Sequence, residues 1–166
     1  MATKRRAREA PGGQRDSSDI ENRQKRVNVP LLELERFLRK LQRELRLQRG
    51  AAFVRLVTDA EMKRLNSKFR KKAKTTDVLS FPAELRSRPR DLRRRTMEVR
   101  GAFLGDIAIS PAVAGRNAKA FHRTRAEEIC VLMLHGILHL LGYDHETDRG
   151  EMERVEATLR RRLGLS

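Results

Sequence analysis

The stretch TRAEEICVLMLHGILHLLGYDH, residues 124–145, decides how the fold of this chain is interpreted. Thr124 and Glu127 have the spacing of a capping box, so the pattern predicts that a helix begins after Thr124. An apolar run follows and indicates a helix buried in the core. Gly142 tolerates a positive φ, which allows it to end this helix and turn the chain.

Three of the four histidines, His135, His139 and His145, lie within eleven residues. A separation of four places His135 and His139 on one helix face, and the turn at Gly142 can bring His145 back toward them. Two histidines four residues apart on a helix often only form its polar edge or are hydrogen-bonded core residues. The third histidine favours metal binding instead, as does the free-energy cost of leaving imidazoles unpaired on an apolar helix. Three neutral imidazoles suit one tetrahedral Zn²⁺ ion with an open fourth position.

The spacing H-x3-H-x2-G-x2-H is also that of the metzincin proteases. Those enzymes carry a Glu directly after the first His as general base, whereas this chain has Gly136 there. Because glycine has no side chain, a peptidase of that mechanism is disfavoured.

The whole chain is short and strongly basic, with 166 residues and a formal net charge of +16. This length suits one domain, and the 39% of hydrophobic residues are enough to build a core. The charge favours a polyanionic partner, nucleic acid before an anionic membrane surface, with a basic but inert surface as the alternative. The longest apolar run, Ile129–Leu141, is too short and too polar to span a membrane.

A single cysteine, Cys130, excludes an internal disulfide framework and an all-cysteine zinc site. It lies in an apolar run, which predicts a buried thiol, and it suits a reducing compartment. No secretory signal is visible at the N-terminus, so a cytoplasmic location is expected. His122 stands apart from the other histidines and is interpreted as a structural or surface residue.

The rest of the chain predicts a tail and one domain. Residues 1–19 lack Val, Ile, Leu and Phe before Ile20, so a disordered basic tail is expected, followed by a single catalytic domain over residues 20–166. Strands are expected over residues 20–28, 51–58, 76–81 and 103–110, and helices over residues 30–50, 58–70, 111–121, from 124 onward, and 146–163. This alternation predicts a largely parallel four-stranded sheet packed with about five helices.

Residues 84–100, with seven Arg, are expected to form a basic loop that either contacts RNA phosphates or is simply solvated.

Other short motifs occur in a definite order before the histidines. They are Leu65-Asn66 through Phe69-Arg70, then Thr76-Asp77-Val78-Leu79-Ser80-Phe81-Pro82, then Leu104-Gly105-Asp106-Ile107-Ala108-Ile109-Ser110. Together with residues 135–145 they resemble the YbeY family of rRNA-maturation endoribonucleases. The resemblance implies an α+β fold with a mixed four-stranded sheet and zinc on the three histidines. It also implies a metal-dependent, single-strand-specific endoribonuclease acting in 16S rRNA 3′-end maturation and ribosome quality control, with rRNA and small-subunit components as partners.

By the same resemblance, Arg70 matches the functional arginine of the family and is the candidate catalytic residue. A guanidinium can bind a phosphate and offset charge that develops during phosphoryl transfer, although an arginine at a helix end also compensates the helix dipole. Residues 61–76 carry seven Lys and Arg against one Glu, a local charge of +6. The expected RNA-binding residues are Lys68, Arg70, Lys71, Lys72 and Lys74.

Two aspartates are candidates for supporting the metal ligands. Asp144 precedes His145 and can orient an imidazole, act as a base or hydrogen-bond the turn. Asp106, in the fourth expected strand, either reaches a ligand imidazole or closes a bulge. Ser80 is expected to line the cleft.

Several functional questions stay open at the level of sequence. The nucleophile is either water or the 2′-hydroxyl of the RNA. A metal-dependent hydrolase of another substrate, such as a peptide, is one alternative. A non-catalytic, zinc-containing ribosome assembly factor is the other, although structural zinc normally has four protein ligands.

Overall fold

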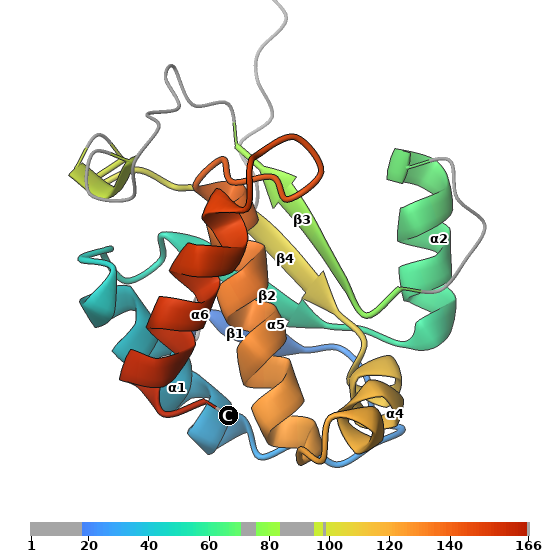
Figure 1. Ribbon diagram of the computed structural model, residues 1–166. Coiled ribbons are helices and arrows are strands. Elements are labelled where there is room, and N and C mark those ends of the chain that lie inside the picture. The colour runs from blue at the N-terminus through green and yellow to red at the C-terminus, as the bar shows by residue number, and fades with distance from the viewer. Residues whose placement is uncertain (1–17, 71–75, 84–94, 98, 166) are drawn as a thin grey trace, which may run out of the picture.

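A computed structural model describes residues 18–70, 76–83, 95–97 and 99–165 of the chain. Its labelled elements are β1 (Ile20–Asn22), α1 (Leu31–Glu44), β2 (Ala52–Leu56), α2 (Asp59–Arg70), β3 (Val78–Pro82), β4 (Gly105–Ile109), α4 (Pro111–Ala120), α5 (Arg125–Leu140) and α6 (Glu151–Leu163). They form one α+β domain in which α5 and α6 lie in front of the sheet and α2 stands beside β3 (Figure 1).

The four strands form one mixed sheet in the order β1-β2-β4-β3. β1 pairs with β2, and β2 with β4, in parallel, whereas β3 pairs with β4 antiparallel. The α+β fold with a mixed sheet is therefore confirmed, but the expectation of largely parallel pairing needs a correction at β3. A parallel pair requires a crossover that returns the chain to the same end of the sheet, as α1 does between β1 and β2; an antiparallel pair does not.

Alternation along the strands separates two hydrophobic clusters. Ile107 and Ile109 of β4 belong to the larger one, which lies under α1, α5 and α6. Ala108, between them, belongs to a smaller cluster that includes Leu79 of β3 and Met62 of α2. Since successive strand residues point to opposite faces, α5 and α2 cover opposite faces of the sheet.

Three elements are shorter than expected. α1 ends at Glu44 rather than near Gly50, since Arg46 has a positive φ of 53° that no helix continues. In the other two, side chains satisfy the backbone nearby. β1 ends at Asn22 rather than near residue 28, and the Gln24 side-chain carbonyl accepts hydrogen bonds from the backbone N–H groups of Arg26 and Val27, at 3.0 Å each. α6 begins at Glu151 rather than at residue 146. There the Asp148 carboxylate accepts from three backbone N–H groups at the start of the helix, which lowers its pKa.

Other expectations concern Cys130 and membrane association. Cys130 is a buried free thiol, and burial raises its pKa to about 12. Among the helices of the described residues, none is long and apolar enough to cross a bilayer. Residues 1–17 of the expected tail and most of the expected basic loop over residues 84–100 lie outside the described residues.

Candidate metal centre

The helix that carries two of the histidines begins as its sequence predicts. The Thr124 hydroxyl accepts a hydrogen bond from the Glu127 N–H at 3.1 Å, and the Glu127 carboxylate accepts from the Thr124 N–H at 2.7 Å. This capping box fixes the first turn of α5. Most of the helix is buried beyond that turn, so its position against the sheet is set by packing along its length.

The end of α5 is a glycine-dependent turn. Gly142 has a φ of 91°, and its N–H donates to the His139 carbonyl at 2.8 Å. The Tyr143 N–H donates to the Leu138 carbonyl at 3.0 Å. These two bonds form a Schellman motif, in which the left-handed residue is usually glycine. The chain therefore changes direction at Gly142, directly after the C-cap residue Leu141.

Asp144 then closes the loop that carries the third histidine. Its side chain accepts from the Glu146 N–H at 3.0 Å, and its carbonyl accepts from the Asp148 N–H at 2.9 Å. These contacts show Asp144 organising the backbone around His145, which is one of the roles expected for it.

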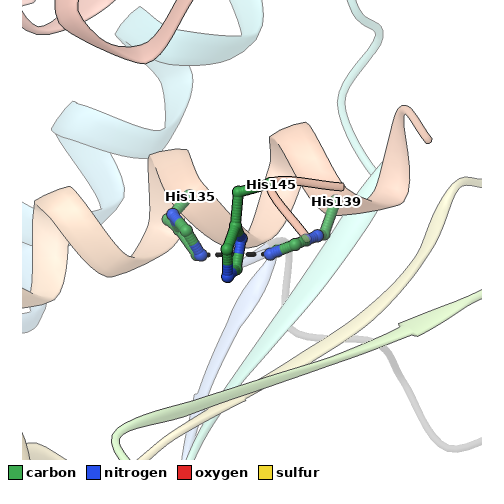
Figure 2. Close-up of side chains that lie close together, drawn as sticks. All are labelled: His135, His139 and His145. Carbon is green, nitrogen blue, oxygen red and sulfur yellow. Dashed lines mark hydrogen bonds between the residues drawn. The ribbon is translucent and has the colours of Figure 1, made fainter. Parts of the chain in front are cut away.

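The three histidines lie together in the folded chain. Their ligand atoms all lie within 4.8 Å of one another, with His135 and His139 half-buried and His145 exposed. The Nε2 atoms of His135 and His139 are 3.0 Å apart. Figure 2 shows the rings converging from α5 and from the loop after it. Among the described residues, no other His, Cys, Asp or Glu belongs to this group.

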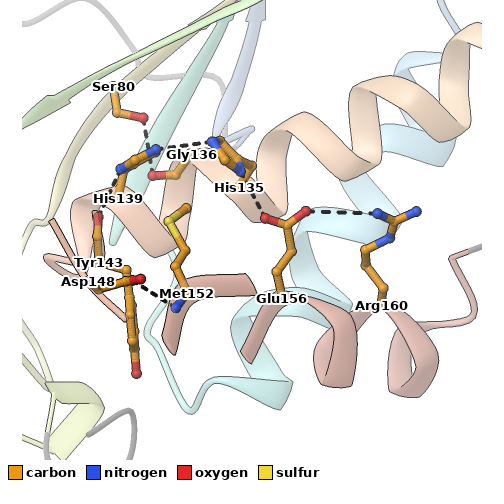
Figure 3. A network of polar contacts seen from close by, with 9 residues as sticks. All are labelled: Ser80, His135, Gly136, His139, Tyr143, Asp148, Met152, Glu156 and Arg160. Atoms are coloured by element: carbon orange, nitrogen blue, oxygen red, sulfur yellow. Dashed lines mark hydrogen bonds and ion pairs between the residues drawn. The ribbon is translucent and has the colours of Figure 1, made fainter. Parts of the chain in front are cut away.

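Hydrogen bonds at the outer nitrogens fix which nitrogen of each helical imidazole faces inward. His139 Nδ1 is 2.9 Å from the Tyr143 carbonyl oxygen, and His135 Nδ1 is 2.8 Å from a carboxylate oxygen of Glu156 (Figure 3). A carbonyl and a carboxylate only accept, so each Nδ1 carries the proton and each neutral ring has a bare lone pair on Nε2.

This arrangement fits a metal ion. The two Nε2 atoms face each other at 3.0 Å, and when both rings are in the neutral form that binds metals, a cation near these two lone pairs stabilises the arrangement. Burial, and secondarily the neighbouring His135, lowers the pKa of His139, which favours the neutral form that binds metals. An imidazole that donates its other N–H to a carboxylate or carbonyl is the usual arrangement of a metal ligand. The group therefore has the donor set and the support that zinc requires.

Gly136 lies between the two helical ligands and faces the sheet. A Cβ built there would lie 2.9 Å and 3.0 Å from two side-chain carbons of Ile107, and 3.2 Å from the Ser80 hydroxyl oxygen. The Ser80 hydroxyl donates to the Gly136 carbonyl at 3.2 Å. A side chain at this position would crowd Ile107 and Ser80 and require them to shift, so the packing, like the sequence, disfavours the Glu of a metzincin.

Arg70 is exposed at the end of α2, on the other face of the sheet from α5. Its neighbour Phe69 makes an edge-to-face contact with Phe81 of β3, with ring centroids 5.0 Å apart. The residue before Phe81 is Ser80, whose hydroxyl donates a hydrogen bond to the Gly136 carbonyl, between the two helical histidines of α5. β3 therefore connects the basic end of α2 to the metal centre. Lys68 is also exposed; Lys71, Lys72 and Lys74 lie outside the described residues.

The structure does not bring Asp106 to the histidines. Its carboxylate forms an ion pair with Arg55 at 3.3 Å and lines a pocket with Phe69 and Phe81. Gly105 and Ile107, the residues on either side of it, face α5. Alternation along β4 thus directs Asp106 to the opposite face of the sheet.

Sequence reasoning missed Glu156. Its partner His135 lies 21 positions earlier in the chain, and acidic residues early in a helix are also favoured by the helix dipole, so Glu156 does not stand out in the sequence. Glu156 also lies 4.0 Å from Arg160, which is one turn further along the same helix. A signal was present in the sequence, since a ligand histidine needs an acceptor for its second nitrogen, but the spacing does not show which acid supplies it.

Comparison with known proteins supports a single assignment. The model of the family described as Endoribonuclease YbeY matches residues 19–164. The chain is 48% identical over 133 residues to the Endoribonuclease YbeY of Solibacter usitatus, covering 80% of this chain and 78% of that protein. It is 46% identical over 110 residues to that of Nautilia profundicola, covering 66% and 70%.

A solved structure agrees with these relatives. The solution structure of TM1509 from Thermotoga maritima matches with a TM-score of 0.55 and 28% identity, covering 82% of this chain and 85% of that one. The family match extends over nearly all of the described residues and includes the three convergent histidines. The chain belongs to the YbeY endoribonuclease family.

Proposed function

We propose that this protein is a zinc-dependent endoribonuclease that cleaves single-stranded RNA. Its role would be 16S rRNA 3′-end maturation and ribosome quality control in the cytoplasm, with ribosomal small-subunit components as partners. The observation that carries the proposal is the convergence of three imidazoles within 4.8 Å, two of them with their outer nitrogens hydrogen-bonded, in a member of this family.

The residues of the chain have separate tasks in this proposal. His135, His139 and His145 hold one zinc ion, which when bound supplies a Lewis acid that acidifies water and polarises a phosphate oxygen. Because β3 is an edge strand of the sheet, a single strand of RNA that wraps this edge would reach both the ion and Arg70 on the other face, where Arg70 binds the backbone and offsets charge on the reacting phosphate. Gly136 leaves α5 without a base at the metzincin position, so the nucleophile is water or the 2′-hydroxyl of the substrate.

The RNA would approach along the basic surface of α2. Lys63, Arg64 and Lys68 are exposed on this helix and line one shallow hollow. Phosphates are attracted to such a surface without regard to sequence, as a single-strand nuclease requires. Lys71, Lys72 and Lys74 follow Arg70 in the chain and are also proposed to bind RNA, although they lie outside the described residues.

Cleavage of end-labelled single-stranded RNA containing a 16S rRNA 3′ end tests the proposal. Wild type is compared with His139→Ala and Arg70→Glu, and the zinc content of each protein is measured. Arg161→Glu, on the exposed side of α6, is the matched control for the change of charge. We expect His139→Ala to lose zinc and cleavage, Arg70→Glu to lose cleavage but keep zinc, and Arg161→Glu to resemble wild type.

Two results would contradict the proposal. Cleavage that persists after zinc is lost would exclude the metal from the reaction. A zinc-loaded wild type that binds RNA without cutting it would instead support a non-catalytic assembly factor. The ends of the products identify the nucleophile, because a 2′,3′-cyclic phosphate results from attack by the 2′-hydroxyl and a 3′-hydroxyl with a 5′-phosphate results from attack by water.

A further inference from the structure

Arg95 is a buried arginine in the segment whose arginines were expected to face solvent or RNA. It is 7% exposed, and its Nη1 donates to the Leu141 carbonyl at 3.2 Å. The centre of its guanidinium lies 3.8 Å from the centroid of the Tyr143 ring. A side chain buried in this way cannot bind a phosphate without leaving its position, so Arg95 has a different task from an RNA-binding arginine.

Two of the residues that Arg95 contacts, Leu141 and Tyr143, lie on either side of Gly142, the glycine at which the chain turns. Leu141 is the cap of α5, where the free carbonyls and the helix dipole favour a cation. Tyr143 is 3% exposed, and its ring provides a cation–π surface. Arg95 therefore bridges the turn at Gly142: it donates a hydrogen bond to Leu141 before the turn and stacks on the Tyr143 ring after it.

This turn is part of the metal centre. The Tyr143 carbonyl accepts from His139 Nδ1 at 2.9 Å, and His145 follows Tyr143 by two residues. A displacement of Tyr143 would therefore change both the orientation of His139 and the position of His145. The position of Arg95 itself is fixed, because the Val99 N–H donates to its carbonyl at 3.2 Å and the Val99 side chain lies in the main core.

We propose that Arg95 is a positioning residue for the metal centre, which holds the turn after α5 so that His139 and His145 are correctly placed for the ion. The inference rests on the proposed zinc site. It assigns to one arginine of the basic segment a role in metal affinity rather than in RNA binding. Outer residues that orient metal ligands typically contribute about 10- to 100-fold to metal affinity.

Titration of the full chain with Co²⁺ in competition with a chelator, read by the visible absorption of the bound ion, tests the inference. Arg95→Met keeps most of the side-chain volume but removes the cation, and we expect it to weaken Co²⁺ binding about tenfold. Arg100→Met, at an exposed position five residues later, is the matched control and should bind within about twofold of wild type. Arg95→Lys restores a cation without the planar fork and should recover part of the affinity.

A cycle with Tyr143→Leu separates this role from a general loss of stability. This variant removes the ring but keeps the backbone carbonyl, so its effect on Co²⁺ affinity should not add to that of Arg95→Met. All titrations are made well below the unfolding temperature of each metal-free variant, where a purely structural role leaves the Kd unchanged.

The outcomes distinguish this inference from the proposed function. If wild type binds Co²⁺ and Arg95→Met binds it equally well, the inference is overturned and the metal site stands. If wild type binds no Co²⁺, both fall. If Arg95→Met does not fold, Arg95→Lys and Tyr143→Leu decide, and wild-type affinity in both would overturn the inference.

Discussion

The histidine turn after α5 and the basic end of α2 lie on opposite faces of the sheet and are built differently. In the histidine turn, the Gly142 and Tyr143 N–H groups donate to carbonyls at the end of α5, and the Asp144 carbonyl accepts from the loop that follows. Two of the imidazoles are also hydrogen-bonded at their outer nitrogens. At the end of α2, Lys68 and Arg70 are exposed, and the ring contact of Phe69 with Phe81 ties this end to the sheet.

The difference follows from what each region has to bind. A metal ion requires lone pairs at fixed positions, so its ligands need defined tautomers and rigid support. Phosphate is attracted by charge acting over several ångströms and tolerates side chains that adjust. We therefore expect the histidine side to respond to changes of single atoms, and the α2 side to respond to charge and salt.

The largest effect is expected at the centre of the histidine group. His139→Ala removes one of three metal ligands. Loss of a residue that only hydrogen-bonds a ligand can lower metal affinity by roughly 100-fold, so loss of the ligand itself should lower it further and abolish RNA cleavage. Metal analysis and a cleavage assay measure both. His122→Asn is the control, because His122 is exposed with a φ of 54°, a conformation that Asn tolerates. Retention of zinc by His139→Ala would contradict the assignment of the site.

Gly136→Glu tests whether packing excludes a metzincin base. The new side chain would enter the contact with Ile107 and place a carboxylate in an apolar interface, so the free energy of unfolding should fall by about 3 kcal/mol or more. Chemical denaturation measures the loss, and a peptidase assay should stay negative. Gly136→Ala should cost less, and Ile107→Val should relieve part of that cost. A stable Gly136→Glu protein would show that the packing argument is wrong.

On the α2 side, Arg70→Ala should lower kcat/KM for RNA by about 100-fold, the typical cost of losing a group that stabilises charge in the transition state. Metal content should not change, because Arg70 lies on the other face of the sheet. Arg64→Ala, earlier on the same helix and also exposed, is the control and should have a much smaller effect. Loss of zinc from Arg70→Ala would show that the two regions are not independent.

Glu156→Gln changes one charge beside the metal centre. The amide can still accept from His135 Nδ1 but no longer offers a carboxylate, so zinc affinity should fall about tenfold while the fold is kept. Competition with a chelator measures the change, and Glu153→Gln, exposed on the same helix, serves as control. Equal zinc affinity in the two variants would remove Glu156 from the support of the site.

The smallest effect belongs to a single phosphate contact. Lys68→Ala should weaken the binding of single-stranded RNA a few-fold and reduce the slope of log affinity against log salt by about one. Lys119→Ala, exposed on α4, should leave the slope unchanged. An unchanged slope in Lys68→Ala would place the RNA elsewhere on the surface.

Local signals in the sequence predicted much of the histidine turn. The capping box at Thr124, the four-residue spacing of His135 and His139, and the glycine at 142 each act within a few residues, so short-range geometry determines the result. The convergence of His145 on the other two follows from that glycine and is found in the structure.

Contacts between distant segments were not predictable in the same way. Glu156 reaches His135 because α6 packs beside α5. β3 pairs antiparallel with β4, and the direction of a strand depends on the end of the sheet at which the chain enters it, which local sequence patterns do not show. Asp106 was placed in the correct strand, but which face it occupies depends on the register of β4 against its neighbours. A shift of one residue in a strand exchanges its two faces, and the sequence pattern did not decide that register.

X-ray absorption at the zinc edge of the zinc-loaded protein tests the central claim most directly. We expect one ion per chain, bound by three imidazole nitrogens at about 2.0–2.1 Å and by one further oxygen ligand that does not come from the protein. A sulfur ligand, four protein ligands, or the same spectrum in His145→Ala would contradict an open three-histidine centre.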